Sequence, residues 1–368
     1  MPERRRARRL RALGDALKHS PTAMAALPDV PTVVDFGDDE SVRGVVAEIV
    51  PHAAAGISEI AVVSGGITNQ LKKVTFAEGP AVLVRVFGAE GMIDRAVENP
   101  TFQAVTAFLG RPSYLGRFAN GRVEGWLEGS RPLSFDEMGD EGWSPKIAAA
   151  MARLHKFEVP ASLAEHYGKP GMWDQLWLWH SQASAESTAA AIAARSAADA
   201  AQLAQIDLVR GKAEMEKLQA AIPAAAPVAF CHNDLLAANI MVNDEAGEVT
   251  LIDFEYGGTN YRGFDIANHF NEWAGGTDDG EPDYAKFPTK EQQTAYCAAY
   301  LAEMGGASDE AAVAALVEES AQFVLADHWY WGLWAVNQAR DEGCEEFPYL
   351  TYAQRRIGQY YAIIEGRA

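Results

Sequence analysis

Three polar side chains in one short stretch, and a fourth just after it, carry the chemistry that this sequence can do. His232, Asp234 and Asn239 are spaced as H-x-D-x-x-x-x-N, and Asp253 follows at the end of an apolar run. One aspartate can accept the proton of a hydroxyl group, while an asparagine and a second aspartate supply the hard oxygen ligands that magnesium prefers. The pattern is typical of phosphoryl transfer, with Asp234 as the catalytic base and Asn239 and Asp253 as catalytic metal ligands.

The surrounding sequence places these residues at strand ends. Short apolar runs predict strands at 228–231, 240–242 and 249–252. A hairpin of the second and third strands would bring Asn239 next to Asp253; the alternative is two unrelated polar turns in an ordinary α/β region. We expect His232 to brace the loop by hydrogen bonds. Cys231 ends a strand that is predicted to be buried, where thiols are usually inert, so we do not expect thiol catalysis.

The first third of the chain reads as a small sheet, and the rest is mainly helical. Apolar runs predict strands at 60–64, 71–76, 81–87, 114–118 and 122–127. Helical spacing predicts helices at 38–49, 95–109, 134–138, 144–157, 172–201 continuing to 221, 290–304, 309–340 and 352–365. The segment 181–226 is dominated by Ala, Ser, Gln and Glu, and we interpret it as a solvated helical hairpin without a chemical role.

Two features of the first part could hold phosphate groups. Gly65 and Gly66 lie in the turn between the first two strands, and glycines allow backbone N–H groups to approach phosphate oxygens. A plain hairpin turn is the alternative. Arg85 is a lone cation in an apolar strand, where its planar guanidinium could hold phosphates, and Glu98 on the following helix is its predicted partner. The alternative is that Arg85 faces solvent from an edge strand.

Composition limits the class of protein. A chain of 368 residues is long enough for about two lobes. Lys+Arg 31 against Asp+Glu 51 gives a net charge of −20, which argues against nucleic acid as a partner. No apolar run approaches the roughly 20 residues of a membrane helix, so we expect no stable membrane insertion. Three scattered cysteines make no disulfide framework and indicate a reducing, cytoplasmic setting.

The amino end differs from the rest of the chain. Residues 1–19 hold seven basic and two acidic residues, and Leu10, Leu13 and Leu17 recur at helical spacing. We interpret this stretch as a solvated, partly flexible tail. A membrane-surface or targeting arm is the alternative.

A second group of residues is aromatic. Trp331 and Trp334, within His328–Trp334, stand three apart and share one face of a helix. Such a stripe is more often part of a core. It could also wall a pocket for an organic cation, to which Glu272 would add a carboxylate.

Longer motifs in the carboxyl-terminal half resemble the choline/ethanolamine kinase family. They are Asp253–Tyr256, Asn260–Phe270, Glu272-Trp273, Trp331–Trp334 with Gln338-Ala339, and Tyr352–Gln354. The similarity covers about residues 60–130 and 228–362. It implies an α+β, protein-kinase-like two-lobed fold with an antiparallel-sheet amino lobe and a mainly helical carboxyl lobe. The expected parts are an extension (1–45), a nucleotide-binding amino lobe (46–130) and a catalytic, amine-binding carboxyl lobe (131–368).

The resemblance also implies site residues and ligands. ATP would be bound by Gly65, Gly66, Thr68, Asn69, Arg85, Glu98, Glu124 and Trp126, with main chain near Glu124 meeting adenine. The amine would be bound by Glu272, Tyr256, Trp331 and Trp334. The resemblance implies ATP and Mg²⁺ as cofactors and a small amino alcohol as substrate, and it allows a homodimer. The product would enter phosphatidylethanolamine synthesis by the CDP-ethanolamine route.

The sequence favours ethanolamine over choline. Choline kinases have a tyrosine-rich stretch after the tryptophan, one member of which helps to enclose the quaternary ammonium, whereas Ala274–Asp279 holds no aromatic residue. A trimethylammonium relies on aromatic faces, but a primary ammonium needs hydrogen-bond acceptors such as Glu272. We therefore expect an ethanolamine kinase, with a choline or dual-specificity kinase as the alternative. An aminoglycoside- or homoserine-type phosphotransferase and a non-catalytic nucleotide-binding module are remoter alternatives.

Overall fold

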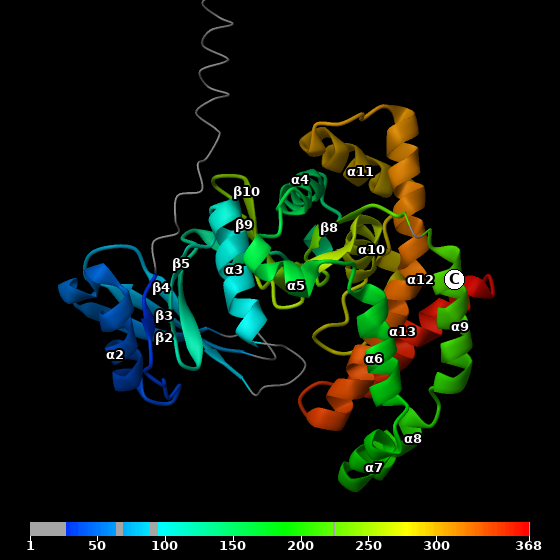
Figure 1. Cartoon of the computed structure of the whole chain (residues 1–368), viewed down its shortest axis with the longest axis horizontal. Helices are drawn as coiled ribbons and strands as arrows, with labels where there is room; N and C mark the ends of the chain where they lie inside the picture. The colour runs from blue at the N-terminus through cyan, green and yellow to red at the C-terminus, as the bar shows by residue number, and fades with distance from the viewer. Residues whose placement is uncertain (1–26, 64–68, 89–94, 224, 368) are drawn as a thin grey trace, which may run out of the picture. The chain divides into compact units, whose positions relative to one another are not determined.

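The computed structural model describes residues 27–63, 69–88, 95–223 and 225–367 (Figure 1). The basic stretch 1–19 therefore lies outside the described residues. The chain divides into two compact units, Met1–Gly88 with Tyr114–Trp126, and Ala89–Ser113 with Leu127–Ala368. The helix Arg95–Leu109 (α3) falls in the second unit, and the expected division at residues 45 and 130 stays a prediction. Among the described helices, none has both the length and the apolarity needed to cross a bilayer.

The first unit is built on a six-stranded sheet with the order β1-β5-β6-β4-β3-β2. Its strands are Asp29–Val30 (β1), Ile57–Val63 (β2), Asn69–Phe76 (β3), Val82–Phe87 (β4), Tyr114–Phe118 (β5) and Gly121–Gly125 (β6). All neighbours are antiparallel except β1 and β5. The five predicted strands correspond to β2–β6. The sequence did not predict β1, because two residues are too few to show an alternating pattern.

One helix packs against the sheet to form the core of the first unit. Helix α2 (Asp39–Ile49) begins after Asp38, whose side chain accepts the N–H of Glu40, and a 3-10 turn at Pro51–Ala55 follows it. Its apolar residues recur every three or four positions, so that they share a face and are buried together with the sheet valines. They are Val42, Val45, Val46 and Ile49.

The second unit contains two small sheets. One has the order β10-β9-β7 and the other pairs β11 with β8. The strands are Ser130–Pro132 (β7), Val228–Cys231 (β8), Ile240–Asn243 (β9), Glu248–Leu251 (β10) and Gly258–Tyr261 (β11). The antiparallel pairing of β9 with β10, in which Ile240 faces Leu251, confirms the predicted hairpin.

Helices make up most of the second unit. Besides α3 they are Ser144–His155 (α4), Ala164–Tyr167 (α5), Met172–Ala183 (α6), Glu186–Arg195 (α7), Ala197–Leu203 (α8), Leu208–Ala221 (α9), Arg262–Glu272 (α10), Lys290–Met304 (α11), Glu310–Asp341 (α12) and Tyr349–Ile364 (α13). Shorter 3-10 turns lie at Phe135–Glu137, where a helix was expected, and at Ala161–Leu163, Ala237–Asn239 and Tyr284–Lys286. The long helix α12 (orange) packs against α6, α10 and α13 (Figure 1).

The segment 172–221 differs from the predicted helix at 172–201 continuing to 221. It forms four helices, because the side chains of Ser196 and Asp207 accept backbone N–H groups and start new helices. Part of the predicted solvated hairpin 181–226 is buried: Ala183, Ile192 and Met215 lie in the same core as α12. The prediction was wrong at these positions, because alanine-rich helices are compatible with buried and exposed faces alike.

Candidate active site

The loop after β8 carries the predicted base, and its backbone is held in an uncommon conformation. Asn233, next to Asp234, has a φ of 67°, a left-handed value that asparagine tolerates better than most residues. Its side-chain amide donates to the carbonyl of Tyr256 at 2.8 Å, and its side-chain oxygen accepts from Asn260 at 2.8 Å. The asparagine side chain therefore fixes the turn that presents Asp234.

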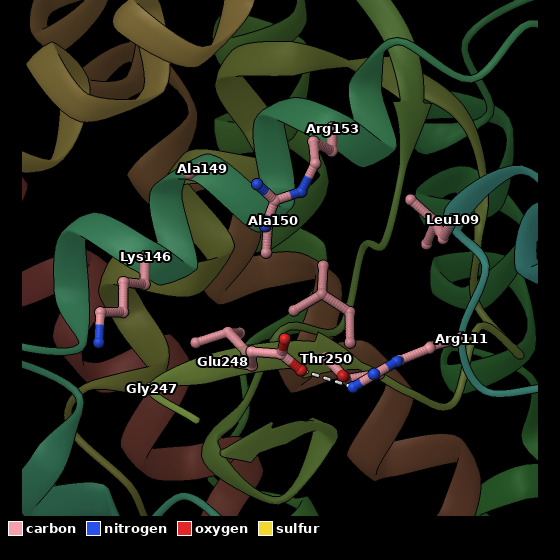
Figure 2. A pocket seen from close by; sticks show the side chains of 11 residues that line it. Leu109, Arg111, Lys146, Ala149, Ala150, Arg153, Gly247, Glu248 and Thr250 are labelled. Atoms are coloured by element: carbon pink, nitrogen blue, oxygen red, sulfur yellow. Dashed lines mark hydrogen bonds and ion pairs between the residues drawn. The ribbon is translucent and has the colours of Figure 1, made fainter. Parts of the chain in front are cut away.

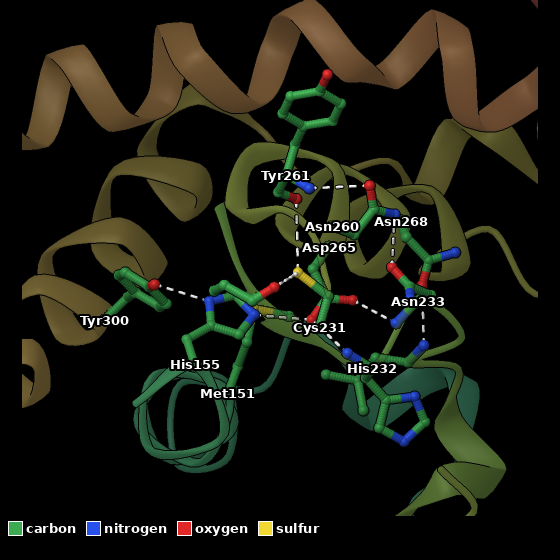
Figure 3. A network of polar contacts seen from close by, with 12 residues as sticks. Met151, His155, Cys231, His232, Asn233, Asn260, Tyr261, Asp265, Asn268 and Tyr300 are labelled. Atoms are coloured by element: carbon green, nitrogen blue, oxygen red, sulfur yellow. Dashed lines mark hydrogen bonds and ion pairs between the residues drawn. The ribbon is translucent and has the colours of Figure 1, made fainter. Parts of the chain in front are cut away.

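Asp265 holds the same loop from helix α10 (Figure 3). Its carboxylate accepts the backbone N–H groups of His232 at 2.9 Å and Asn233 at 2.6 Å, and it also accepts Nε2–H of His155 at 2.8 Å. Burial disfavours ionisation of Asp265, but hydrogen bonding from His155 and the charges of the two histidines outweigh it, and its pKa lies below the usual value. Asp265 lies within the motif Asn260–Phe270, but its local sequence does not indicate this role.

The next turn of α10 holds the other side of the base. The backbone N–H of Leu235 donates to Asn268 at 2.8 Å, and Nδ1–H of His269 donates to the Leu235 carbonyl at 3.0 Å. Asp265, Asn268 and His269 are spaced i, i+3 and i+4, so they share one face of the helix. Both chain neighbours of Asp234 are thus bonded to the same rigid element.

The predicted metal ligands are brought together by the β9–β10 hairpin. The backbone N–H of Ile252 donates to the carbonyl of Asn239 at 3.0 Å, and Nε2–H of His232 donates to the carbonyl of Ile252 at 2.8 Å. Asn239 also donates its side-chain amide to the backbone carbonyl of Asp234 at 2.8 Å and to its carboxylate at 3.1 Å. Asp253 has a φ of 62°. The hydrogen bond of His232 to Ile252 braces the loop, as predicted for this residue.

The base lies in a negatively charged environment. Burial, followed by the charges of Glu272, Glu255 and Asp253, raises the pKa of Asp234 well above its usual value. Carboxylates that crowd one buried site repel each other unless cations neutralise them. The site is therefore built to receive positive charge, as magnesium or an ammonium group would bring.

The predicted aromatic residues form one packed group. Trp334 donates its indole N–H to the hydroxyl of Tyr256 at 2.8 Å. The ring of Trp331 stands edge-on to Tyr256 and to Trp334, with centroids 5.2 and 5.4 Å away. Burial and the charges of Glu255 and Asp234 raise the pKa of the Tyr256 hydroxyl, so this ring lies within electrostatic reach of the base. The stripe belongs to the core and also borders the acidic site.

Glu272 has a partner that the sequence analysis missed. Its Oε1 accepts from Nη1 of Arg356 at 2.8 Å, and both side chains are almost fully buried. Among the described residues, Oε2 of Glu272 has no hydrogen-bond partner. Burial raises the pKa of Glu272 to about 6, although Arg356 opposes the shift. Tyr284 lies within electrostatic reach of Glu272 and Arg356. A tyrosine is therefore present near Glu272, although residues 274–279 contain no aromatic residue.

The predicted nucleotide residues fall mostly in the first unit. Gly65, Gly66 and Thr68 lie outside the described residues, and Asn69 is described only as the first residue of β3. Arg85 donates Nε–H to Glu124 at 2.9 Å, and Arg122 donates to the same oxygen at 2.6 Å. Burial opposes ionisation of Glu124, but the two arginines lower its pKa. The pairing of Arg85 with Glu98 stays a prediction.

Lys73 and Trp126 make a further contact in the first unit. The ammonium of Lys73 lies 4.5 Å from the ring centroid of Trp126, and the Trp126 backbone N–H donates to the carbonyl of Ala81 at 3.1 Å. These bonds fix the strand end where adenine is expected. The contact of adenine with this stretch stays a prediction.

Comparison with known proteins adds an independent line of support. A family model described as choline/ethanolamine kinase matches residues 60–361, which is most of the chain. The chain belongs to the choline/ethanolamine kinase family. It is therefore a kinase, and membership of the family implies ATP as the phosphoryl donor. The resemblance that the motifs indicated is confirmed.

Similar proteins include some that are named ethanolamine kinases and some that are named choline kinases. A probable ethanolamine kinase of Arabidopsis thaliana is 34% identical over 311 residues, which cover 81% of this chain and 77% of the relative. Ethanolamine kinase 2 of Rattus norvegicus is 32% identical over 92% of this chain and 85% of its own. Probable choline kinase 3 of Arabidopsis thaliana is 29% identical over 82% and 86%.

Solved structures confirm the fold of this family member. An ethanolamine kinase of Plasmodium vivax matches with a TM-score of 0.75 and 22% identity, covering 90% of this chain and 91% of that chain. A macrolide 2'-phosphotransferase type I has a TM-score of 0.51 at 17% identity. The predicted α+β, protein-kinase-like fold is thus confirmed, whereas the substrate is a separate question.

A pocket of about 500 Å³ lies elsewhere in the second unit of the kinase, between one face of α4, the strand β10 and the end of α3 (Figure 2). Arg111 donates to Glu248 there at 2.6 Å, and Lys146 and Arg153 add two exposed cations. None of the predicted site residues lines this pocket. The candidate active site at the loop after β8 is therefore separate from this pocket.

His269 gives the kinase a testable pH dependence. Its Nδ1–H donates to Leu235 and its Nε2 accepts from the Trp273 indole, so the neutral ring fits, and burial lowers its pKa to about 4. The unfolded chain takes up this proton near pH 6.5, so the free energy of unfolding should fall by about 1.4 kcal/mol per pH unit between 6.5 and 4 from this group.

Denaturant unfolding of His269→Asn against the original protein checks this. Asparagine can donate to the same carbonyl but does not titrate, so the difference in unfolding free energy should shrink as the pH falls. A matched change at exposed His166 should leave the slope unaltered. Equal slopes for all three proteins would contradict the argument.

Proposed function

We propose that this kinase transfers the γ-phosphoryl group of ATP to the hydroxyl of ethanolamine, which gives phosphoethanolamine. The observation that carries the proposal is Oε2 of Glu272, which has no hydrogen-bond partner among the described residues. It is buried, and Glu272 lies within electrostatic reach of Asp234. A buried carboxylate oxygen without a donor is costly, and a primary ammonium has three N–H groups to supply one.

The aromatic group supports a cationic substrate of small size. Tyr256, Trp331 and Trp334 offer ring faces and edges beside the acidic site, and such rings attract organic cations. A trimethylammonium has no N–H and would leave the Glu272 oxygen without a hydrogen bond. Because several relatives are named choline kinases, a choline or dual-specificity kinase stays the second candidate.

Asp234 acts as the base in the proposed reaction. Its carboxylate accepts the proton of the substrate hydroxyl as the oxygen attacks the γ-phosphorus, and the bond from the γ-phosphorus to the bridging oxygen breaks so that ADP leaves. Burial and the surrounding carboxylates raise the pKa of Asp234, and positive charge bound beside it would favour its ionised form. The bonds from α10 to both chain neighbours of Asp234 hold the carboxylate in place during transfer.

Asn239 and Asp253 fit magnesium, because amide and carboxylate oxygens are the ligands it takes in proteins. The amide nitrogen of Asn239 donates to Asp234, which turns its amide oxygen the other way. When bound, magnesium neutralises the charge on the phosphate oxygens. Arg85, held by Glu124, is proposed to bind the nucleotide phosphates with the turn at Gly65 and Gly66.

We also propose a cytoplasmic location. Cys231, Cys297 and Cys344 are free thiols, which reducing compartments preserve. Burial raises the pKa values of the first two thiols, so they are poor nucleophiles.

Steady-state ATP turnover with ethanolamine, monomethylethanolamine and choline tests the substrate. We expect kcat/KM to fall in that order, by roughly 10-fold or more from ethanolamine to choline, because each methyl group removes a donor from the Glu272 oxygen. Equal or higher kcat/KM for choline would overturn the choice of amine. Absence of turnover with all three would overturn the proposed function.

A further inference from the structure

A chain of hydrogen bonds joins the loop after β8 to Glu272, the carboxylate proposed to bind the amine. Helix α10 closes this chain into a ring, whose members are Asn268, Asp327, Arg356 and Glu272. Leu235, which follows the base, donates its N–H to Oδ1 of Asn268 at 2.8 Å. The amide of Asn268 donates to Oδ1 of Asp327 at 3.1 Å, and Nη2 of Arg356 donates to Oδ2 of Asp327. Nη1 of Arg356 then donates to Oε1 of Glu272 at 2.8 Å.

The ring returns to the helix from which it starts. Asn268 and Glu272 are four residues apart on α10, so they lie on one face, one turn from each other. Asp327 lies on α12 and Arg356 on α13, and α12 packs against both α10 and α13. Three helices are thereby fixed against each other by polar groups.

The ring carries charges that only an accurate geometry can stabilise. Asn268, Asp327, Arg356 and Glu272 are exposed by 0, 0, 1 and 2%. Buried charges are tolerated only when each has partners at hydrogen-bond distance, so a displaced member loses its partner at high cost. Arg356 bridges the two carboxylates, and Oε2 of Glu272 has no hydrogen-bond partner among the described residues.

We propose that Arg356 and Asp327 are positioning residues that set the spacing between the base Asp234 and the ammonium acceptor Glu272, and thereby select the length of the amino alcohol. The inference rests on the proposed function. One end of the ring holds the residue next to the base, and the other end holds the acceptor. A substrate that must present its hydroxyl to one group and its ammonium to the other is therefore sensitive to a shift of either end of the ring.

A ring with a purely structural role would behave differently. Its loss would lower stability and would reduce turnover of all substrates by the same factor. A positioning role predicts a change in the ratio of kcat/KM for ethanolamine to that for 3-amino-1-propanol. It also predicts a larger effect on the KM of the amine than on the KM of ATP.

The test compares Arg356→Met and Arg356→Lys with the original kinase. Methionine removes the guanidinium, and lysine keeps the charge without the fork that bridges two carboxylates. We expect Arg356→Met to raise the KM of ethanolamine by roughly 10- to 100-fold and to bring the two-carbon to three-carbon ratio towards one. The KM of ATP should stay within about twofold of the original, and Arg356→Lys should lie between, because it retains only the charge.

Arg262→Met is the matched control. Arg262 donates to Glu319 at 3.0 and 2.6 Å, so it also joins α10 to α12 by a guanidinium–carboxylate pair, but it lies outside the ring. It should lower the melting temperature and leave the substrate ratio unchanged. If Arg356→Met does not fold, the near-isosteric Asp327→Asn serves instead, and it should shift the ratio in the same direction.

The outcomes separate the two proposals. Ethanolamine turnover by the original kinase, with an unchanged substrate ratio in folded Arg356 and Asp327 variants, would overturn the positioning role and leave the proposed function standing. A ratio that also shifts in Arg262→Met would show a general effect of helix packing and would overturn it too. If the original kinase turns over neither amine, the proposed function fails, and this inference fails with it.

Discussion

Replacement of Asp234 by asparagine is expected to lower kcat by roughly 10²- to 10⁴-fold while the fold stays intact. The carboxylate is the group held beside Asn239 by a 3.1 Å hydrogen bond, with both chain neighbours bonded to α10. Asparagine has the same shape and keeps these neighbours in place, but its amide oxygen is too weak a base to accept the hydroxyl proton.

Stability should move in the opposite direction. Burial and the charges of Glu272, Glu255 and Asp253 raise the pKa of Asp234 in the folded protein, so wherever the unfolded chain ionises this group the aspartate lowers the free energy of unfolding, and asparagine removes that cost. The melting temperature of Asp234→Asn should therefore equal or exceed that of the original protein. A variant that is inactive because it is unfolded would fail this part of the prediction.

Single-turnover and steady-state rates, with circular dichroism of the same samples, make the measurement. Asp244→Asn is the control, since Asp244 lies in the turn between β9 and β10, is exposed, and pairs with Arg131 at the surface. It should keep kcat within about twofold. Near-normal phosphorylation by Asp234→Asn would sink the assignment of the base.

Replacement of Asp253 by asparagine should give the second large effect, a fall in kcat of at least about 100-fold together with weaker magnesium dependence. Asp253 has a φ of 62°, and asparagine is among the few residues that tolerate this backbone. The substitution therefore removes the negative charge from the proposed magnesium site without straining the chain. Alanine at the same position would add backbone strain to the loss of the ligand.

A magnesium titration at saturating ATP and ethanolamine separates these causes. In Asp253→Asn the magnesium concentration for half-maximal turnover should rise by roughly 10-fold or more, with a melting temperature close to that of the original. Asp253→Ala should lose activity and also melt earlier. An unchanged magnesium requirement in Asp253→Asn would refute the ligand role.

The parts of the site that lie close together in the sequence were predictable. Asn239 and Asp253 flank a hairpin of two short strands, and such a hairpin brings its ends together without help from the rest of the chain. The strands β2–β6 of the first unit were predictable for the same reason, because alternation and turn residues are local signals. The helices α2, α3, α11 and α12 followed from their apolar spacing.

The partners that lie far apart in the sequence were not predictable. Arg356 meets Glu272 across 84 residues, and nothing in either local sequence indicates the other. Arg85 donates to Glu124 because β4 pairs with β6 in one register, which places Arg85 opposite Arg122. A shift of one residue in that register would have turned the charges to the other face.

The sequence by itself determined the chemistry of this protein and the family to which it belongs. Asp234, Asn239 and Asp253 are close together in the sequence, and the β9–β10 hairpin that brings Asn239 near Asp253 is a local structure. Only the tertiary structure decided how the base is held and what the acceptor carboxylate pairs with. Asp265, Asn268, Asp327 and Arg356 act through buried hydrogen bonds between helices, and such bonds depend on which helices pack together. Packing is a property of the whole fold, so no local pattern could reveal it.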